Sequence, residues 1–416
     1  MARDPEDRIG LGHVATVSFL ASRAAPSAQF WLALGGGVAL ARTAMRAGAR
    51  TGFGVSLAAM LQTVAVMGPA RVNAPLTQAL TAPVMGRLQA RHAPAWVEFL
   101  ACLAIRLVHY AVLMAFFVFV VLGGIDAVTT TYERLTGWLG VVPDGPVAAL
   151  GALAAGNVAW ALFFSVTQVA IYRRALGAWP APEHGSAPVS GPGGTVRATA
   201  VGPGDTIRTP GRFDPRAVVL AAVLASGLLL ASTAWLLLIG VLAWLVPAWL
   251  LAKPDRDALP LGAALAGMLA FAALTGGLLG GAGLELTLRR ALRAVLLVAV
   301  ATWMRAAAGP DGLRETFRRA LSRLHRLPGV AEASVVFAGL DAGPRLIAAG
   351  RAAANRFSAV ELRPTQLADA LTLWVATEAA AYAPGAGAPR PALRLRAPDG
   401  LLLALTLAPA FALVGH

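Results

Sequence analysis

The chain is poor in cysteine, lysine, aromatic residues and charge. Cys102 is the only cysteine in 416 residues, which excludes an intrachain disulfide and a zinc site built from several cysteines. Charged residues make up 13% of the chain, whereas soluble domains average about 25%. Because 57% of the residues are hydrophobic, too few polar residues remain to cover a soluble surface. The composition therefore predicts a multi-pass membrane protein, with the lipid bilayer as a partner.

The sequence also lacks common catalytic signatures. It has no HExxH zinc motif, no phosphate-binding P-loop and no GxSxG nucleophile motif. Its six histidines are scattered without the spacing of metal ligands. We therefore expect no metal, no cofactor and no catalytic residues, although a membrane enzyme with unfamiliar residues stays open.

Most of the charged residues are positive. The net charge is +14, and Lys253 is the only lysine, so arginine supplies almost all of it. Such a balance can indicate nucleic-acid binding, but the arginines are spread over many loops beside apolar runs. Arginines in such places are typical of cytoplasmic loops and lipid headgroup contacts. We expect no nucleic-acid partner.

The run from Trp96 to Leu122 is the central element. About 27 helical residues rising about 1.5 Å each extend about 40 Å, enough to cross a bilayer with tilt. Its second half has no charge after His109, whereas its first half carries Glu98 and Arg106 as well. The run predicts a membrane helix with a polar entrance.

We expect residues 26–176 to form the first membrane half, after a cytoplasmic or interfacial segment, residues 1–25, in which we find no pattern of a cleavable signal peptide. The other apolar stretches of this half are residues 28–45, 51–70 and 146–172. Residues 71–95 contain three prolines, which predict a cytoplasmic loop with amphipathic pieces or a re-entrant segment.

Residues 177–215 are rich in Pro, Gly, Ser and Thr, which predicts a disordered linker. The second membrane half, residues 216–305, follows it. The apolar stretch 217–252 is too long for one crossing, so it forms either one long tilted helix or a hairpin around Ser232 and Thr233. Residues 259–283 predict a span, and residues 284–305 a juxtamembrane helix or a further span. We expect about five to seven transmembrane helices in all.

The distribution of arginine predicts the orientation. Residues 71–95 and 173–216 are basic, whereas residues 123–146 carry one arginine and three acidic residues. Because cytoplasmic loops collect arginine, we expect the first two segments, and the C-terminal part with them, on the cytoplasmic side of a cell membrane.

Residues 310–416 differ from the rest and predict a small soluble α/β domain. Apolar residues at helical spacing predict an amphipathic helix that ends before Pro328. AEASVVFA and PRLIAAG predict strands, and residues 363–382 a second helix. PALRLRA and LLLALTLA flank a Pro-Asp-Gly turn, which predicts a closing β-hairpin.

This order resembles the roadblock/LC7 type of α/β sandwich over about the last 105 residues. The resemblance is carried by LHRLPGVAEASVVF at 324–337, the helix around Leu367 to Ala381, and the hairpin from Leu393 to Leu407. Members of that family commonly dimerise, and some regulate small GTPases. The resemblance therefore implies an α/β fold and a homo-oligomer, without naming a partner. The membrane region resembles no family that we can name.

Four residues of the central run fall on one helical stripe: Glu98, Cys102, Arg106 and His109. Ionisable groups inside a span mark a polar pathway or a buried pair. This stripe is either a proton or ion relay or a set of structural contacts, in which Arg106 extends toward the headgroups and His109 bonds to a neighbouring helix.

Other polar residues extend the candidate site. Asn157 and Gln168 share a face of the next span, and Gln62 is the one strongly polar interior residue of its stretch; all three suit interhelical hydrogen bonds. Arg42, Arg46 and Arg50 are spaced four residues apart and predict one stripe that contacts lipid headgroups or an anionic solute.

Two classes of function remain for this prokaryotic-type membrane protein. The favoured one is a membrane scaffold or signalling protein, whose residues 310–416 self-associate or recruit a cytosolic protein. The alternative is a transporter or channel component that uses the polar residues of the 96–122 helix.

Overall fold

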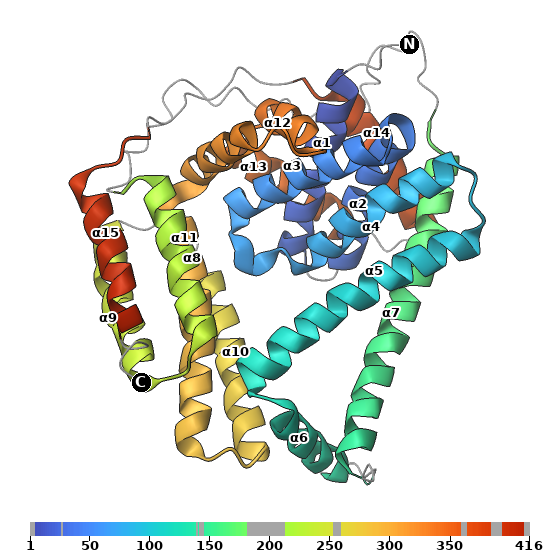
Figure 1. Cartoon of the computed structure of the whole chain (residues 1–416). Helices are drawn as coiled ribbons and strands as arrows, with labels where there is room; N and C mark the ends of the chain where they lie inside the picture. The colour runs from blue at the N-terminus through green and yellow to red at the C-terminus, as the bar shows by residue number, and fades with distance from the viewer. Residues whose placement is uncertain are drawn as a thin grey trace.

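The computed structural model describes residues 5–25, 28–138, 140, 145–180, 213–252, 259–358, 364–383 and 393–411 (Figure 1). Every regular element in these ranges is helical. The predicted linker falls mostly on residues 181–212, which lie outside the described residues.

The helices follow one another in four groups. The first comprises α1 Pro5–Ala24, α2 Gln29–Ala47, α3 Ala49–Met67, the 3-10 turn η2 Pro69–Arg71 and α4 Asn73–Ala90. The second comprises α5 Ala95–Phe116, the π-helix η3 Phe117–Leu122, α6 Ile125–Trp138 and α7 Pro146–Gly177. The third comprises α8 Pro215–Ala231, α9 Trp235–Ala252, α10 Leu259–Leu279 and α11 Leu284–Arg323. The fourth comprises α12 Val330–Gly339, α13 Gly343–Ser358, α14 Pro364–Ala381, α15 Ala397–Leu407 and η5 Ala408–Ala410.

The prediction of an α/β domain in residues 310–416 is wrong, because no strand occurs among the residues described there. AEASVVFA is helical in α12, which buries Ala333, Val336 and Phe337. PRLIAAG is helical in α13, which buries Leu346 and Gly350. Both sets lie three or four residues apart, so their burial follows a helical period, and packing outweighs the strand preference of the two valines.

The predicted closing hairpin is wrong for a different reason. Pro398 occupies the first turn of α15, where a missing backbone N–H costs nothing. Asp399 accepts the backbone N–H of Arg396 at 2.7 Å and so caps the helix N-terminus. Pro-Asp-Gly therefore starts a helix here instead of turning between strands.

Two large hydrophobic cores hold most of the helices together, and two smaller clusters pack η3 against its neighbours. One joins α1 to α4 with α12, α13 and α14, and reaches into α5 and α7. The other joins α8, α9, α11 and α15. The helices formed by residues 330–381 thus share a core with the N-terminal helices.

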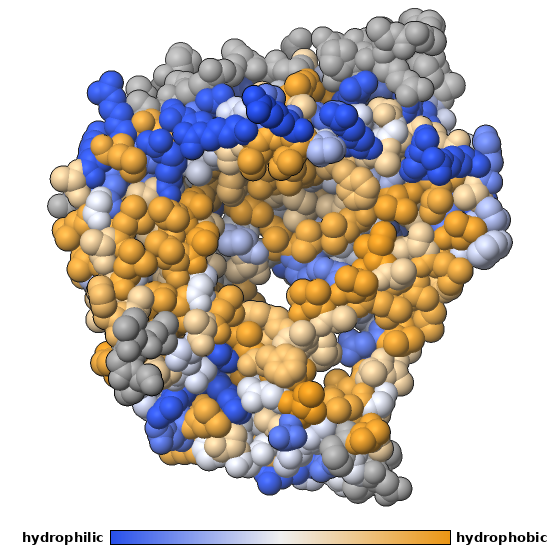
Figure 2. Space-filling model, in the orientation of Figure 1, coloured by the Kyte–Doolittle hydropathy of each residue, from blue (hydrophilic) through white to orange (hydrophobic). Residues whose placement is uncertain are grey.

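Five helical segments are long and apolar enough to cross a membrane, as expected for a helical membrane bundle. They are Ala95–Leu122, Val147–Gly177, Trp235–Ala252, Gly262–Leu279 and Leu284–Arg323. Figure 2 shows a broad hydrophobic band between hydrophilic residues that gather at two opposite ends of the molecule. Residues 28–45 and 51–70 are not among these segments; α2 and α3 contribute to the first core instead.

The structure decides two alternatives that the sequence leaves open. Residues 217–252 form a helical hairpin, because Ser232 is extended and ends α8 before α9 starts at Trp235. Residues 284–305 belong to α11, which is one of the candidate spans. Gly309, at φ +66°, bends α11 before Pro310.

Arginines of α11 bind the ends of other helices. Arg290 donates to the carbonyls of Leu122 at 2.7 Å and Gly123 at 3.0 Å, at the end of η3. Arg305 donates to Val66 O near the end of α3 at 2.6 Å, and Arg314 donates to Leu340 O at the end of α12. Carbonyls at a helix C-terminus lack intrahelical donors and carry partial negative charge. The three arginines therefore join α11 to three other elements.

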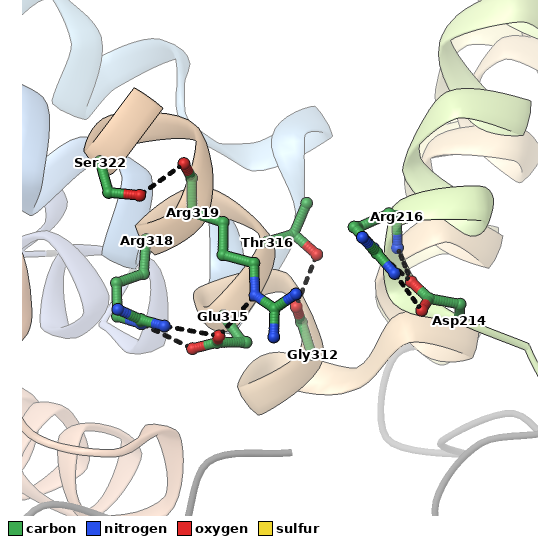
Figure 3. A network of polar contacts seen from close by, with 8 residues as sticks. All are labelled: Asp214, Arg216, Gly312, Glu315, Thr316, Arg318, Arg319 and Ser322. Atoms are coloured by element: carbon green, nitrogen blue, oxygen red, sulfur yellow. Dashed lines mark hydrogen bonds and ion pairs between the residues drawn. The ribbon is translucent and has the colours of Figure 1, made fainter. Parts of the chain in front are cut away.

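Two sets of polar contacts face each other, one on the last turns of α11 and one at the start of α8 (Figure 3), and Arg319 of the first interacts electrostatically with Asp214 of the second. The buried carboxylate of Glu315 accepts from Arg318 and Arg319, at 2.7 and 2.9 Å. On the opposite side Asp214 caps α8 by accepting the backbone N–H and the guanidinium of Arg216.

Candidate functional site

The side chains that α5 buries are its polar ones. Its four buried residues are Glu98, Cys102, Arg106 and His109, the stripe predicted from the sequence. The apolar side faces outward instead: Val108 and Val112 are 66% and 64% exposed. In water this arrangement would be reversed, so α5 has the polarity of a helix with lipid outside and polar groups inside.

The centre of the site is a contact between α5 and α7. The guanidinium of Arg106 donates to Oε1 of Gln168, and both side chains are buried. The Cys102 thiol lies 3.5 Å from the same oxygen and donates to it. The Gln168 side chain thus accepts from two residues of α5.

The same site includes α4. Gln168 donates through Nε2 to Thr81 Oγ1 at 2.7 Å, so one amide connects three helices. One turn further along α7, Tyr172 donates to Gln78 Oε1 at 2.7 Å. Gly37 of α2 makes room for this bond, because a Cβ there would lie 1.6 Å from the Tyr172 hydroxyl.

Each end of the row has its own partner. Glu98 is fully buried and accepts from Arg173 of α7 at 3.1 Å and from Gln89 of α4 at 3.4 Å. At the other end, His109 Nε2 lies 2.9 Å from Asn73 Oδ1 at the start of α4. Every member of the predicted stripe therefore contacts α4 or α7.

Arg106 is the unusual member. Its guanidinium has the amide oxygen of Gln168 and, at 3.4 Å, the Tyr110 hydroxyl as acceptors. It also lies over the ring of Phe164, 5.7 Å from the centroid. In the part of the chain that the structure describes, no carboxylate pairs with it, and its Nε is buried without an acceptor. A buried cation held by neutral groups retains the capacity to attract an anion.

Two predicted members of the site lie elsewhere. Asn157 donates to the carbonyl of Leu153 in its own helix at 2.9 Å and bridges to no other helix among the described residues. Gln62 of α3 donates to the backbone of Asp341 at 3.3 Å, in the connection between α12 and α13.

Gln62 belongs to a second buried cluster. His13 of α1 stacks on Tyr382 with a centroid distance of 4.1 Å, and its Nδ1 lies 3.9 Å from the Asp341 carboxylate. Burial lowers the pKa of His13 from 6.5 to about 4 and raises the pKa of Asp341. The histidine is therefore neutral at pH 7.

The predicted arginine stripe is divided between two helices. Gly48, at φ +90°, ends α2, so Arg42 and Arg46 lie on α2 and Arg50 on α3. Arg42 lies 4.8 Å above the Trp179 ring. Arg46 pairs with Asp7 at 2.5 Å and Arg50 with Glu332 at 2.8 Å. Each arginine thus has a partner within the protein.

Sequence reasoning missed the contribution of α4, because three prolines predict a loop or a re-entrant piece over residues 71–95. The segment forms α4, with Pro83 inside it. Asn73, Gln78, Thr81 and Gln89 all bond to α5 or α7. Their spacing of three to eight residues was the available signal, since it places polar groups along one side of a helix.

The groups at this site can hold a ligand through hydrogen bonds and charge. The site combines one buried cation with amide, hydroxyl, thiol and imidazole groups. No cluster of three or more His, Cys, Asp or Glu side chains suited to a metal occurs among the described residues. In comparisons with known proteins, the chain matches no family model, no curated protein and no solved structure.

Proposed function

We propose that this chain is a multi-pass protein of the cell membrane that binds an anionic solute between α4, α5 and α7, as part of a transporter or channel. The observation that supports this proposal best is the buried Arg106 guanidinium, which has neutral partners only in the described part of the chain. Burying an ion without a counter-ion is costly, so such a group in a candidate span favours a functional role.

Because Arg106 has no buried acidic partner among the residues that the structure describes, an anion is favoured over a cation as the ligand. Glu98 lies two helical turns away, and Arg173 already pairs with it. The neighbouring groups, Gln168, Tyr110 and Cys102, can rearrange their hydrogen bonds when an anion binds. His109, one turn from Arg106 and bonded to Asn73, extends the polar row.

The proposed orientation places the end that carries α12 and α13 in the cytoplasm. The start of α5 and the end of α7 lie at one end of the pair, joined by the Glu98–Arg173 ion pair. Both connect to the arginine-rich segments 71–95 and 173–216. Arg290 and Arg293 lie at the opposite end, but they bind carbonyls of η3 and do not act as free loop charges.

Anion binding tests the proposal. Chloride, inorganic phosphate and acetate would each be added to the purified full chain while its thermal unfolding is followed. A bound anion raises Tm in proportion to the logarithm of its concentration. We expect this rise for at least one anion with the native chain and not with Arg106→Gln. Arg289→Gln, which changes a half-buried arginine outside the site, should keep the rise; no rise with any anion would refute the proposal.

A second candidate function is a membrane scaffold or signalling protein that self-associates or recruits a cytosolic protein through residues 310–416. The observation that favours it is the connection between α11 and α12, where residues 322–328 are all exposed. Leu324 and Leu327 are both 52% exposed there. Chemical crosslinking of the full chain with and without Leu324→Asp and Leu327→Asp tests this function: crosslinks that these changes do not reduce would count against it.

A further inference from the structure

A groove of 470 Å³ lies between α9 and α15, away from the α4–α5–α7 site. Its ten lining residues are all apolar; α9 contributes Trp244, Pro247 and Leu251 among them, and α15 contributes Leu401 and Leu405. Its size falls in the range of about 300–1,000 Å³ typical of sites for small ligands. Because α9 is one of the candidate spans, the groove faces the part of the surface where lipid chains are the surrounding molecules.

The surface beside the groove is also apolar. Leu250 and Leu401 are 77% and 61% exposed, and Leu405 is 47% exposed. In water such a surface would be expected to bind another protein, but Leu250 lies on the candidate span α9, so the surface next to it lies against hydrocarbon. The occupant that fits both the groove and its surroundings is an acyl chain.

One polar group in the groove wall has no partner. Trp244 is 5% exposed, and its indole Nε1–H is buried without an acceptor among the described residues. The adjacent Trp303 differs, because its Nε1–H donates to the carbonyl of Ala248 at 3.0 Å. A buried indole N–H normally has an acceptor, and an ester carbonyl at the head of an acyl chain would supply one.

Two arginines lie at the end of the groove where α15 begins. Arg394 and Arg396 are exposed and immediately precede Ala397 and Pro398, which line the groove. Neither arginine has an ion-pair partner in the part of the chain that the structure describes. The third arginine nearby, Arg216, is already paired with Asp214. The two unpaired arginines therefore supply positive charge where a lipid headgroup would lie.

The segment that carries these arginines is fixed in place. Asp399, buried in the first turn of α15, accepts the backbone N–H of Asp214 at 2.7 Å and that of Arg396 at 2.7 Å. The beginning of α15 is thereby joined to the beginning of α8. The end of the groove at the start of α15 is thus fixed in place, so a lipid headgroup would meet a preformed site.

From these observations we propose that the groove binds one phospholipid, with an acyl chain between α9 and α15 and its phosphate at Arg394 and Arg396. The lipid ester would accept the Trp244 N–H. This site is separate from the proposed anion site, so either can fail without the other.

The test uses the full chain in bilayer nanodiscs. The probe is phosphatidylglycerol with a photoreactive diazirine on one acyl chain, and labelled residues are identified by peptide mass spectrometry. We expect labelling concentrated on residues 244–251 and 397–405, above the level on the exposed face of α7. Equal labelling of α7 and of the groove would mean ordinary surrounding lipid and would overturn the proposal.

Two variants with the same substitution separate the groove from the outer face of α15. Ala397→Trp places an indole in the groove, whereas Ala404→Trp places one on an exposed position that does not line it. We expect the first to reduce groove labelling to the α7 level and the second to leave it unchanged. Similar labelling of the groove in Ala397→Trp and Ala404→Trp would contradict the proposal. Crosslinks from this groove to another protein in place of lipid would contradict it as well.

Two further comparisons test the polar contacts and do not depend on the folding of Ala397→Trp. The Trp244→Phe variant should release the bound lipid more readily than the native chain. Trp160→Phe changes an exposed tryptophan of α7 and should not change the release. The double change Arg394→Gln and Arg396→Gln should weaken labelling by phosphatidylglycerol about tenfold or more, but not labelling by a diacylglycerol with the same chain. An equal loss of labelling by phosphatidylglycerol and by the diacylglycerol would refute the headgroup contact.

Discussion

Arg106 and Gln168 lie 62 residues apart in the chain, yet the guanidinium of the first donates to the side-chain oxygen of the second. Both are buried, and each lies on a different candidate span. Since the Gln168 amide also donates to Thr81, this one side chain connects α4, α5 and α7. The anion site that we propose is built around this contact.

Removing the Gln168 amide should loosen the three helices. Gln168→Leu leaves the Arg106 guanidinium with fewer acceptors and Thr81 without its donor. Buried polar groups that lose a partner typically cost about 1–3 kcal/mol each. We expect a clear fall in Tm on thermal unfolding in detergent. Asn157→Leu is the control, because in the described part of the chain Asn157 bonds only within its own helix; an equal fall for both variants would contradict the bridging role of Gln168.

Gly37 is expected to be intolerant of any side chain. A Cβ at this position would lie 1.6 Å from the Tyr172 hydroxyl and 3.0 Å from Gln78 Oε1. Gly37→Ala should therefore separate α2 from α7, break the Tyr172–Gln78 bond and lower stability by about 1–3 kcal/mol. Thermal unfolding measures the change.

Gly156→Ala provides the matched comparison on α7, since nothing lies within 4 Å of a Cβ there. In a helix this change should be neutral or stabilising, by up to about 1 kcal/mol. If Gly37→Ala were as stable as Gly156→Ala, the close approach of α2 to Tyr172 would be wrong.

Arg290 should protect the end of η3 from opening. It donates to the carbonyls of Leu122 and Gly123, which have no helical turn beyond them. Arg290→Gln should therefore raise hydrogen exchange in residues 117–124, because local opening becomes easier by about 1–3 kcal/mol. Hydrogen exchange of residues 117–124, followed by mass spectrometry, measures this change.

The neighbouring Arg289 is the control for that measurement. It is half-buried and pairs with the exposed Glu285 one turn away, and a helix pair of this kind contributes about 0.3–0.5 kcal/mol. Arg289→Gln should leave exchange in residues 117–124 unchanged. Faster exchange there in both variants, to the same extent, would argue against a specific contact of Arg290.

Acid should destabilise the chain through His13. Burial lowers its pKa from 6.5 to about 4 in the folded state, so the unfolded chain binds the proton first as the pH falls. The His13 contribution is therefore complete above about pH 6.5 and lost progressively toward pH 4, by about 3 kcal/mol at most. Thermal unfolding at pH 7.5 and pH 5 should show a fall in Tm that is smaller in His13→Gln.

His325→Gln changes an exposed histidine and should keep the full pH dependence. The raised pKa of the nearby Asp341 acts in the opposite direction at lower pH, so the comparison with His13→Gln isolates the histidine. The same pH dependence in the native chain and in His13→Gln would rule out His13 as the cause.

The sequence predicts the helical membrane character and the polar stripe of α5, because both depend on local spacing. Glu98, Cys102, Arg106 and His109 share one side of a helix at any tilt, and burial selects that side. Local spacing also predicts that Gln168 lies on a neighbouring span. The sequence does not predict its contact with Arg106, because that contact depends on how α5 and α7 pack.

The C-terminal fold could not be predicted because its short apolar runs suit a strand and a buried helix equally. Val335, Val336 and Phe337 favour a strand, but the packing of α12 against α3 and α11 selects a helix. Pro398 and Asp399 are equally ambiguous, as they start helices and turns alike. In both places tertiary contacts decide between two locally acceptable conformations.

The role of the α11 arginines was also hidden in the sequence. Arg290 and Arg293 suggest a cytoplasmic position, since arginine near a span is usually a loop charge. In the structure they bind carbonyls at the end of η3, so they say little about sidedness. Only the relative positions of two helices distant in the chain could reveal this pairing.

The most direct test of the anion proposal is flux through proteoliposomes that contain the full chain. Vesicles loaded in turn with chloride, phosphate or acetate would be compared for the native chain, Arg106→Gln, Arg106→Lys and Arg289→Gln. We predict efflux of at least one anion that Arg106→Gln abolishes, Arg106→Lys retains in part and Arg289→Gln leaves intact. Efflux from native-chain vesicles no faster than from protein-free vesicles, or unchanged in Arg106→Gln, would contradict the proposal.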